Sequence, residues 1–393
     1  MAVGSYYTPT HVLFGKGAEE EVGRELKKEG ATRVLVHYGS DRIKKTGLLD
    51  KVLGLIEKEG IKTFTLGGVV PNPRVSLVRK GVEMVRENGI DFILAIGGGS
   101  VIDSSKAIAY GGVYDGDVWD FYSQKAVPKA SMKTGCILTM AAAGSEMSDS
   151  SVITNDEGGL KRGCNTDYCR LRFALCNPEF TYSLPPYQTA AAIVDIMMHT
   201  MERYFIKGET LSFTDNMATA LLRTVVQWGP VALKEPENYE ARANIMWASS
   251  ISHNGFTAFG NCARGDWACH QLEHELSGMF DVAHGAGLSA IWSSWARYVY
   301  KEEPSRFASF GRDVFGLALT GDADADALRA IDTTEAFFRS LGMPVRISDF
   351  GIDLTEEQLE ELTIKATFFG KRTLGQFMKL SHDEIKDVYR SAK

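Results

Sequence analysis

Short apolar runs alternate with amphipathic stretches over residues 33–139. The runs at 33–38, 63–66, 91–99 and 136–139 are short and apolar, and we predict them to be strands. The stretches 45–60 and 74–89 have apolar residues at helical spacing, and each ends in a glycine, which suits a helix C-terminus. Alternation of strands and helices at this period predicts a parallel sheet flanked by helices.

The pattern changes near residue 184. Pro185 and Pro186 open a long helical run, and strand-like segments become scarce from there to Lys393. A chain of 393 residues also suits two domains better than one core. We therefore predict an α/β domain over residues 1–184 and an all-helical domain over residues 185–393.

Composition narrows the class of protein. The formal net charge is −7 with no long basic run, which argues against nucleic acid and anionic membrane surfaces as partners. No apolar stretch approaches the ~20 residues of a membrane span, and the first residues carry no apolar signal core. The six cysteines form no CxxC pair or framework spacing, so we expect free thiols in a reducing cytoplasm.

Three segments of the first half have the composition of cofactor contacts. The strongest is AIGGGSVID, in which three glycines follow an apolar strand and lead into a helix whose N–H groups can meet a diphosphate. An ordinary glycine-rich turn is the alternative, and Asp103 either aids the helix N-terminus or contacts the cofactor. The others are residues 36–47, at the end of the first strand and after it, and residues 138–154, either a polar loop over a ligand or a solvated loop.

The second half contains a set of potential metal ligands. Asp195 and His199 are four residues apart on a predicted helix, His270 and His274 repeat that spacing, and His284 follows in a turn-like stretch. One carboxylate with two or three imidazoles suits a divalent metal such as Zn(II) or Fe(II). Exposed helical histidines are the alternative, but the apolar neighbours indicate a buried setting, where such groups need partners.

Together these motifs resemble the iron-containing alcohol dehydrogenase family, nearest its butanol dehydrogenase and NADPH-dependent aldehyde reductase branch. The resemblance rests on PNP at 71–73, GGGSVID at 97–103, GSE at 144–146 and the Asp/His set in this order. It implies a Rossmann-like, dinucleotide-binding α/β domain (1–184) and an all-α, metal-binding domain (185–393), with catalysis in the cleft between them. This is also the dehydroquinate synthase-like fold.

The resemblance also implies roles for individual residues. Asp195, His199, His270 and His284 would be the metal ligands, and His274 would lie beside the nicotinamide as a proton-relay or positioning residue. The positions implied for cofactor binding are Gly39, Ser40, Asn72, Gly98, Gly99, Ser100, Asp103, Thr139, Ser145, Ser148, Lys161 and Leu184. One departure concerns the loop at 141–145, where Ala141 and Ala143 replace the usual Pro and Thr.

The function implied is hydride transfer between NADP(H) and a primary alcohol/aldehyde pair, assisted by one divalent metal, Fe(II) or Zn(II). NADP(H) is favoured over NAD(H) because Gly39 stands where NAD-dependent relatives carry a carboxylate, with Ser40, Lys44 and Lys45 close by. Asp41 is the contrary evidence, so NAD(H) stays open.

Other functions are compatible with the same motifs. They are an NAD-linked alcohol or polyol dehydrogenase, a metal-dependent lyase of the dehydroquinate synthase-like class, and a cofactor-binding redox sensor without turnover. The resemblance also implies a homodimer. Residues 6–15 could pair as an edge strand with a second chain or lie within their own domain.

Overall fold

The computed structural model describes residues 4–393, so residues 1–3 of the predicted first domain lie outside the described residues. The chain divides into two compact units. One is the α/β unit, Tyr7–Ser183, and the other is the helical unit, which comprises Leu184–Lys393 and the described residues before Tyr7.

A six-stranded parallel sheet forms the centre of the α/β unit, in the order β1-β8-β5-β4-β2-β3. Every residue of β4 is buried, because helices cover both faces of such a sheet. The strands are β1 (His11–Phe14), β2 (Arg33–Tyr38), β3 (Lys62–Leu66), β4 (Phe92–Gly97), β5 (Lys133–Leu138) and β8 (Phe173–Cys176). The α/β and all-α fold class predicted from the sequence is confirmed.

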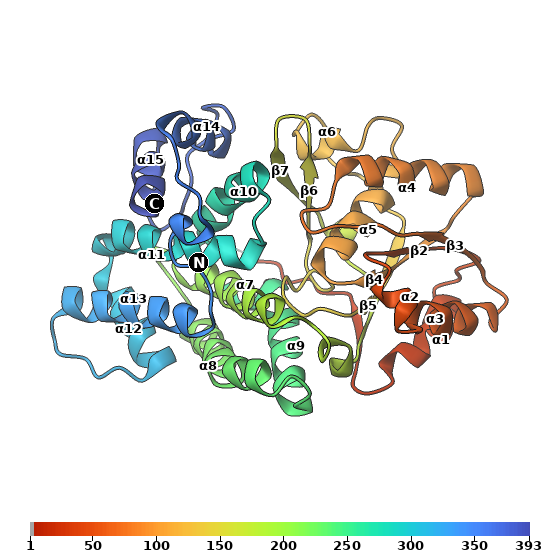
Figure 1. Cartoon of the computed structure of the whole chain (residues 1–393), viewed down its shortest axis with the longest axis horizontal. Coiled ribbons are helices and arrows are strands. Elements are labelled where there is room, and N and C mark those ends of the chain that lie inside the picture. Colours follow the sequence, from red (N-terminus) through yellow and green to blue (C-terminus); the bar gives the residue numbers. More distant parts are fainter. Residues whose placement is uncertain (1–3) are drawn as a thin grey trace. The chain divides into compact units, whose positions relative to one another are not determined.

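Two apolar clusters hold helices against this sheet, one on each face (Figure 1). Leu35 and Ile93 point to one face and pack with α4 and α5, whereas Val34 and Leu94 point to the other and pack with α1 and α3. The helices of this unit are α1 (Val22–Lys28), α2 (Arg42–Lys45), α3 (Leu48–Glu57), α4 (Val75–Asn88), α5 (Gly99–Gly111) and α6 (Trp119–Tyr122), with 3-10 turns η1 (Ala18–Glu21), η2 (Asp167–Cys169) and η3 (Pro178–Thr181).

The sequence analysis did not predict β8 or the antiparallel hairpin formed by β6 (Ser150–Asn155) and β7 (Leu160–Asn165). The segment considered as a polar loop over 138–154 is therefore a loop only as far as residue 149. Of the two alternatives for residues 6–15, the structure has the second, since β1 pairs with β8 at the edge of its own sheet.

The helical unit is built around α7 (Pro186–Tyr204), which is buried from Thr189 to Tyr204. The remaining helices are α8 (Ser212–Lys234), α9 (Tyr239–His253), α10 (Ala268–Phe280), α11 (His284–Val299), α12 (Pro304–Phe315), α13 (Ala323–Ser340), α14 (Glu356–Ala366) and α15 (His382–Ser391), with 3-10 turns η4 (Phe256–Ala258), η5 (Tyr300–Glu302) and η6 (Ile347–Phe350). Burial over this range means that the polar side chains of α7 need partners inside the protein. No helix among the described residues is long and apolar enough to cross a membrane.

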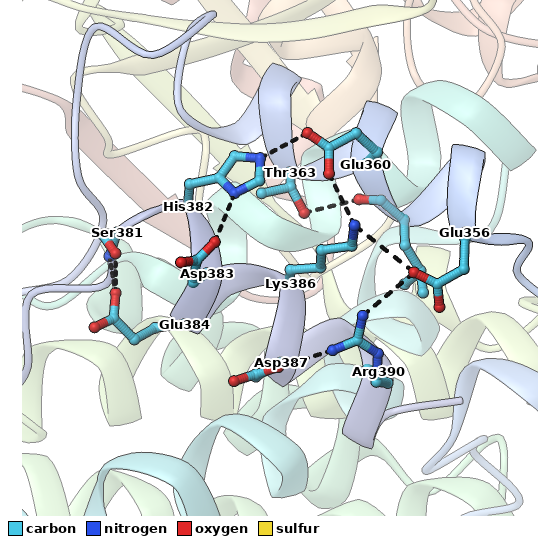
Figure 2. Close-up of polar contacts among 11 residues, drawn as sticks. Glu356, Glu360, Thr363, Ser381, His382, Asp383, Glu384, Lys386, Asp387 and Arg390 are labelled. Carbon is cyan, nitrogen blue, oxygen red and sulfur yellow. Dashed lines mark hydrogen bonds and ion pairs between the residues drawn. The ribbon is translucent and has the colours of Figure 1, made fainter.

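An exposed polar network joins the last two helices of the chain (Figure 2). Glu360 on α14 binds both His382 and Lys386 on α15, at 2.8 Å and 2.9 Å, and Glu356 lies 3.3 Å from Arg390. Exposed ion pairs of this kind contribute little to stability, so the buried face of α15, not this network, fixes the helix in place.

Candidate functional site

The structure brings the four predicted metal ligands together from three helices of the helical unit. Asp195 and His199 lie on α7, His270 lies on α10, and His284 is the first residue of α11. Asp195 Oδ1 is 3.2 Å from His199 Nδ1, 3.8 Å from His270 Nε2 and 3.7 Å from His284 Nε2. One oxygen of the Asp195 carboxylate therefore lies within 4 Å of all three imidazoles.

Two atoms of this set indicate that it is built for a cation. Asp195 Oδ1 and His270 Nε2 are buried and have no hydrogen-bond partner among the described residues. Other buried atoms, such as Trp292 Nε1 and Ser105 Oγ, also have no partner among the described residues. Here, however, an oxygen and an imidazole nitrogen without partners face each other at 3.8 Å, which fits an ion between them. Asp195, His199 and His270 each offer a ligand atom within 4.8 Å of the others. The donor types fit Fe(II) and Zn(II) equally.

The buried surroundings shift the pKa values of Asp195, His199 and His270. Burial alone raises the pKa of the Asp195 carboxyl, but the electrostatic influence of the nearby His199, His284 and His270 imidazoles outweighs it and lowers the pKa. Burial lowers the pKa of His199 well below its ordinary value. The carboxylate is thus ionised and this imidazole is neutral, which are the states that metal ligands require. Burial lowers the pKa of His270, but Glu202 and Asp195 outweigh this and raise it to about 9, so a metal that binds His270 must displace a proton.

His274 lies beside this set. It is buried on α10, and its ring centroid is 5.7 Å from that of His284 and 6.5 Å from that of His270. Glu273, His274 and His284 form a second group whose potential ligand atoms lie within 4.8 Å of one another.

The sequence analysis missed two buried carboxylates that contact the predicted ligands. Glu202 Oε2 is 2.7 Å from His270 Nδ1, and Glu273 hydrogen-bonds His284 Nδ1. A signal was present, because Glu202 is seven residues after Asp195 and Glu273 is three after His270, so each shares a helix face with a ligand.

Aromatic side chains also border the predicted ligands. The His253 ring stacks on that of His199 at a centroid distance of 4.0 Å, and Trp267 lies 5.3 Å from His270. The Arg203 guanidinium lies over the Trp267 ring at 4.5 Å. The spacing of the motifs in the sequence did not indicate that these side chains lie next to the predicted ligands.

In the α/β unit, the glycine-rich turn contacts the loop that follows β5. Gly98 caps α5 and Gly99 begins it, directly after β4. A Cβ on Gly98 would lie 2.9 Å from Met140 Cβ, and one on Gly99 would lie 2.8 Å from Ala143 Cβ. Only glycine therefore permits this approach, which leaves the first N–H groups of α5 uncovered by side chains at these positions.

The serines of the next segment are organised by a buried lysine that the sequence analysis did not select. Lys106 Nζ donates to the main-chain oxygens of Ser145, Ser148 and Ser150 and to the hydroxyls of the first two, at 2.7–3.2 Å. Asp103 accepts from the Ser145 hydroxyl at 2.5 Å and from the Val152 N–H at 2.9 Å. Asp103 and Lys106 thus tie α5 to the loop and to β6.

The remaining predicted cofactor residues are dispersed. Gly39 and Ser40 follow β2, Ser100 and Thr139 flank the glycine-rich turn, and Asn72 is buried with a left-handed φ of 53°. Lys161 is buried on β7, whereas Leu184 belongs to the helical unit. Asp41 is exposed and its carboxylate lies 2.8 Å from Lys44 Nζ, which lowers the Asp41 pKa.

A parallel sheet with a glycine-rich turn at its carboxyl edge, and a buried Asp/His set in a separate helical unit, define a class of metal-assisted, nicotinamide-dependent oxidoreductases. The chain belongs to the iron-containing alcohol dehydrogenase family. The model described as iron-containing alcohol dehydrogenase matches residues 9–178, and the model for the C-terminal part of the Fe-containing alcohol dehydrogenase family matches residues 189–393.

Individual relatives are similar along their whole length. NADH-dependent butanol dehydrogenase A of Clostridium acetobutylicum is 39% identical over 388 residues, with 98% of each chain covered. The NADPH-dependent aldehyde reductase YqhD of Escherichia coli is 34% identical, again with 98% of each covered. The crystal structure of an NADH-dependent butanol dehydrogenase A from Thermotoga maritima superposes with a TM-score of 0.95 at 32% identity, covering 100% of this chain and 99% of that one.

These similarities confirm the family resemblance and the prediction of an enzyme of the NAD(P)-dependent alcohol dehydrogenase type.

Proposed function

We propose that the protein transfers hydride between NADP(H) and a primary alcohol/aldehyde pair, as a metal-dependent enzyme of the butanol dehydrogenase or aldehyde reductase type. The observation that carries the proposal is the buried pair Asp195 Oδ1 and His270 Nε2, which has no hydrogen-bond partner among the described residues. The printed activities of the relatives, butanol dehydrogenase and aldehyde reductase, support the substrate class.

In this proposal the helical domain, residues 185–393, holds one Fe(II) or Zn(II) ion through Asp195, His199, His270 and His284. When bound, the ion acts as a Lewis acid toward the oxygen of the alcohol or aldehyde. The chain's own contribution is the set of donors itself, three of which are buried and lie on α7 and α10. His274 moves or holds the substrate proton from beside this set.

The first domain, residues 1–184, binds the nicotinamide cofactor. The N–H groups at the start of α5 suit a diphosphate, because Gly98 and Gly99 leave the backbone accessible and the helix dipole is positive there. We assign the remaining cofactor contacts to Gly39, Ser40, Asn72, Ser100, Asp103, Thr139, Ser145, Ser148, Lys161 and Leu184.

A preference for NADP(H) over NAD(H) is supported by the segment after β2. Asp41, the carboxylate that would repel a 2′-phosphate, pairs with Lys44 and is exposed, and Gly39 adds no charge. The names of the relatives point the other way, because four butanol dehydrogenases at 39–40% identity are named NADH-dependent or probable NADH-dependent enzymes, whereas the NADPH-dependent aldehyde reductase is 34% identical.

Gly39→Asp tests this preference. The added carboxylate should shift kcat/KM toward NAD(H) by about 5–150-fold through repulsion of ~1–3 kcal/mol. Gly39→Ala is the matched control, since it adds the Cβ, 3.3 Å from the Val69 carbonyl oxygen, without the charge. A higher kcat/KM with NADH than with NADPH in the unmodified enzyme would contradict the preference.

The proposed reaction is tested by following the absorbance of reduced nicotinamide with a panel of small aldehydes and either metal. Oxidation of NADPH that depends on both aldehyde and metal supports the proposal. Metal-dependent conversion of substrate without cofactor oxidation would favour a lyase, and cofactor binding without turnover would favour a redox sensor. An NAD-linked alcohol or polyol dehydrogenase would instead prefer NADH and its own substrates.

We also propose a homodimer in the cytoplasm. The edge position of β1 supports pairing with a second chain, and six free cysteines among the described residues suit a reducing compartment. A monomer mass independent of concentration in light scattering would refute the dimer.

A further inference from the structure

Glu202 and Glu273 are buried carboxylates outside the proposed ligand set. Their exposed fractions are 1% and 0%, and such residues stay buried in a folded protein only when paired. Both contact an imidazole of the proposed metal site. Their negative charge therefore belongs to the electrostatics of that site.

Each carboxylate binds a histidine that belongs to another helix. Glu202 on α7 accepts from the Nδ1 of His270 at 2.7 Å and also from the main-chain N–H of that residue, at 3.1 Å, on α10. Glu273 on α10 accepts from the Nδ1 of His284 on α11 and from the Ser277 hydroxyl. Glu202 thus links α7 to α10, and Glu273 links α10 to α11.

The other nitrogen of each histidine faces Asp195. His270 Nε2 and His284 Nε2 lie 3.8 Å and 3.7 Å from Asp195 Oδ1. An Nδ1–H that donates to a carboxylate leaves the lone pair on Nε2, so both imidazoles are held in the tautomer that can bind a cation.

We propose that Glu202 and Glu273 are positioning residues that fix the tautomer and orientation of His270 and His284 and, through their charge, set the metal affinity of the site. This inference rests on the proposed function, because it takes the metal ligands as given there.

The second effect concerns the net charge of the side chains buried around the proposed metal site. With Asp195, the two carboxylates carry three negative charges, and the buried Arg203 guanidinium, which donates to the His199 carbonyl oxygen at 2.8 Å, offsets one of them. A buried excess of negative charge attracts a cation far more strongly than it would in water. A carboxylate also makes a neutral imidazole a stronger donor through its Nδ1–H.

A role in folding alone is the alternative, because Glu202 also satisfies an N–H of the first turn of α10. The two roles separate on replacement by glutamine. At position 273 the amide oxygen can still accept from His284 Nδ1 while the NH2 group donates to the Ser277 hydroxyl, so only the charge is lost. At position 202 one of the two His270 N–H groups loses its acceptor as well. A folding role predicts unchanged metal affinity in a folded glutamine variant.

The experiment measures metal affinity in the full-length chain, stripped of metal, for Glu202→Gln and Glu273→Gln made singly. Zn(II) is titrated in competition with a chromophoric chelator, and Co(II) is added separately to record its visible absorption bands. Each variant should bind Zn(II) with a Kd about 10–100-fold higher than the unmodified chain and shift the Co(II) bands. Because the variants lie on different helices, either one tests the proposal if the other does not fold.

Two further variants serve as controls. Asp326→Asn removes a buried carboxylate of α13 that binds Thr320, and it should leave both readouts unchanged. His270→Ala should lose the metal. If His270→Ala loses it while both folded glutamine variants keep the unmodified Kd and Co(II) spectrum, the inference is overturned and the proposed ligand set stands. If His270→Ala keeps stoichiometric metal, the ligand set itself is wrong.

Discussion

The α/β unit and the helical unit both bury charged side chains, but they differ in whether the chain supplies all the hydrogen-bond partners of these groups. In the α/β unit, Lys106 Nζ is surrounded by serine oxygens at 2.7–3.2 Å, all from the chain itself. In the helical unit, Asp195 Oδ1 and His270 Nε2 have no hydrogen-bond partner among the described residues. A buried charge that the chain satisfies is structural, whereas one left incomplete points to a ligand.

The same difference in hydrogen-bond partners distinguishes two buried histidines, one from each unit. His37, on β2, is fully buried, and its two ring nitrogens lie 2.7 Å from the Leu66 carbonyl oxygen and 2.8 Å from the Ser104 hydroxyl. His270 has one nitrogen bound by Glu202 and the other directed at Asp195. Only the second has a lone pair available to an ion.

Removing a proposed ligand should have the largest effect. His270→Ala leaves Asp195 and the other donors buried without their ion, so the variant should lose most bound metal and nearly all activity while it still binds nicotinamide. Metal content by elemental analysis and cofactor binding by fluorescence would check this. His382→Ala, at an exposed site, is the control and should change neither. Full activity of His284→Ala at stoichiometric metal would contradict the ligand set.

His274→Ala should separate acid–base chemistry from metal binding. The side chain lies next to the proposed ligands but is not assigned to the ion, so the variant should keep its metal and lower kcat by ~10²–10⁴-fold. The pH profile of kcat should change as well. Metal loss equal to that of His270→Ala would show instead that His274 is a ligand.

Lys106→Met would remove the buried charge whose hydrogen bonds are all supplied by the chain. Three main-chain oxygens of the serine segment would lose their donor, and Asp103 would lose a nearby positive charge, so we expect a loss of about 3–5 kcal/mol in the free energy of unfolding. Metal content should not change. Urea unfolding of the variant measures this, with Lys125→Met, an exposed lysine, expected to cost less than ~1 kcal/mol. Unchanged stability of Lys106→Met would show that the contacts are incidental.

His37 should make the stability of the α/β unit depend on pH. Burial lowers its pKa from 6.5 to about 4, against the smaller raising effect of the Leu66 carbonyl. Because the unfolded chain takes up the proton first, this stabilisation is complete above pH 6.5 and is lost as the pH falls toward 4, by about 3 kcal/mol at ~1.4 kcal/mol per pH unit. Unfolding free energies over this range should fall less steeply for His37→Gln. Equal slopes would refute the assignment.

Much of the fold followed from local pattern. The strands predicted at 33–38 and 63–66 match β2 and β3 within a residue, and the helix predicted over 74–89 matches α4, with Gly89 in the left-handed region after its end. The hairpin β6–β7 was missed because its residues are polar and small. Strand β6 also donates main-chain N–H groups to Asp103 and Pro73, which are distant in the sequence.

For the site, the sequence by itself determined the donor types and their helical spacing, since Asp195 and His199 must share a face of any helix that contains them. The family resemblance implied which four of these residues would be the metal ligands. Only the tertiary structure decided that His270 meets Glu202 and that His284 meets Glu273. The partner of a buried side chain depends on which helix packs beside it, and that choice is made by the whole core rather than by residues nearby in the chain.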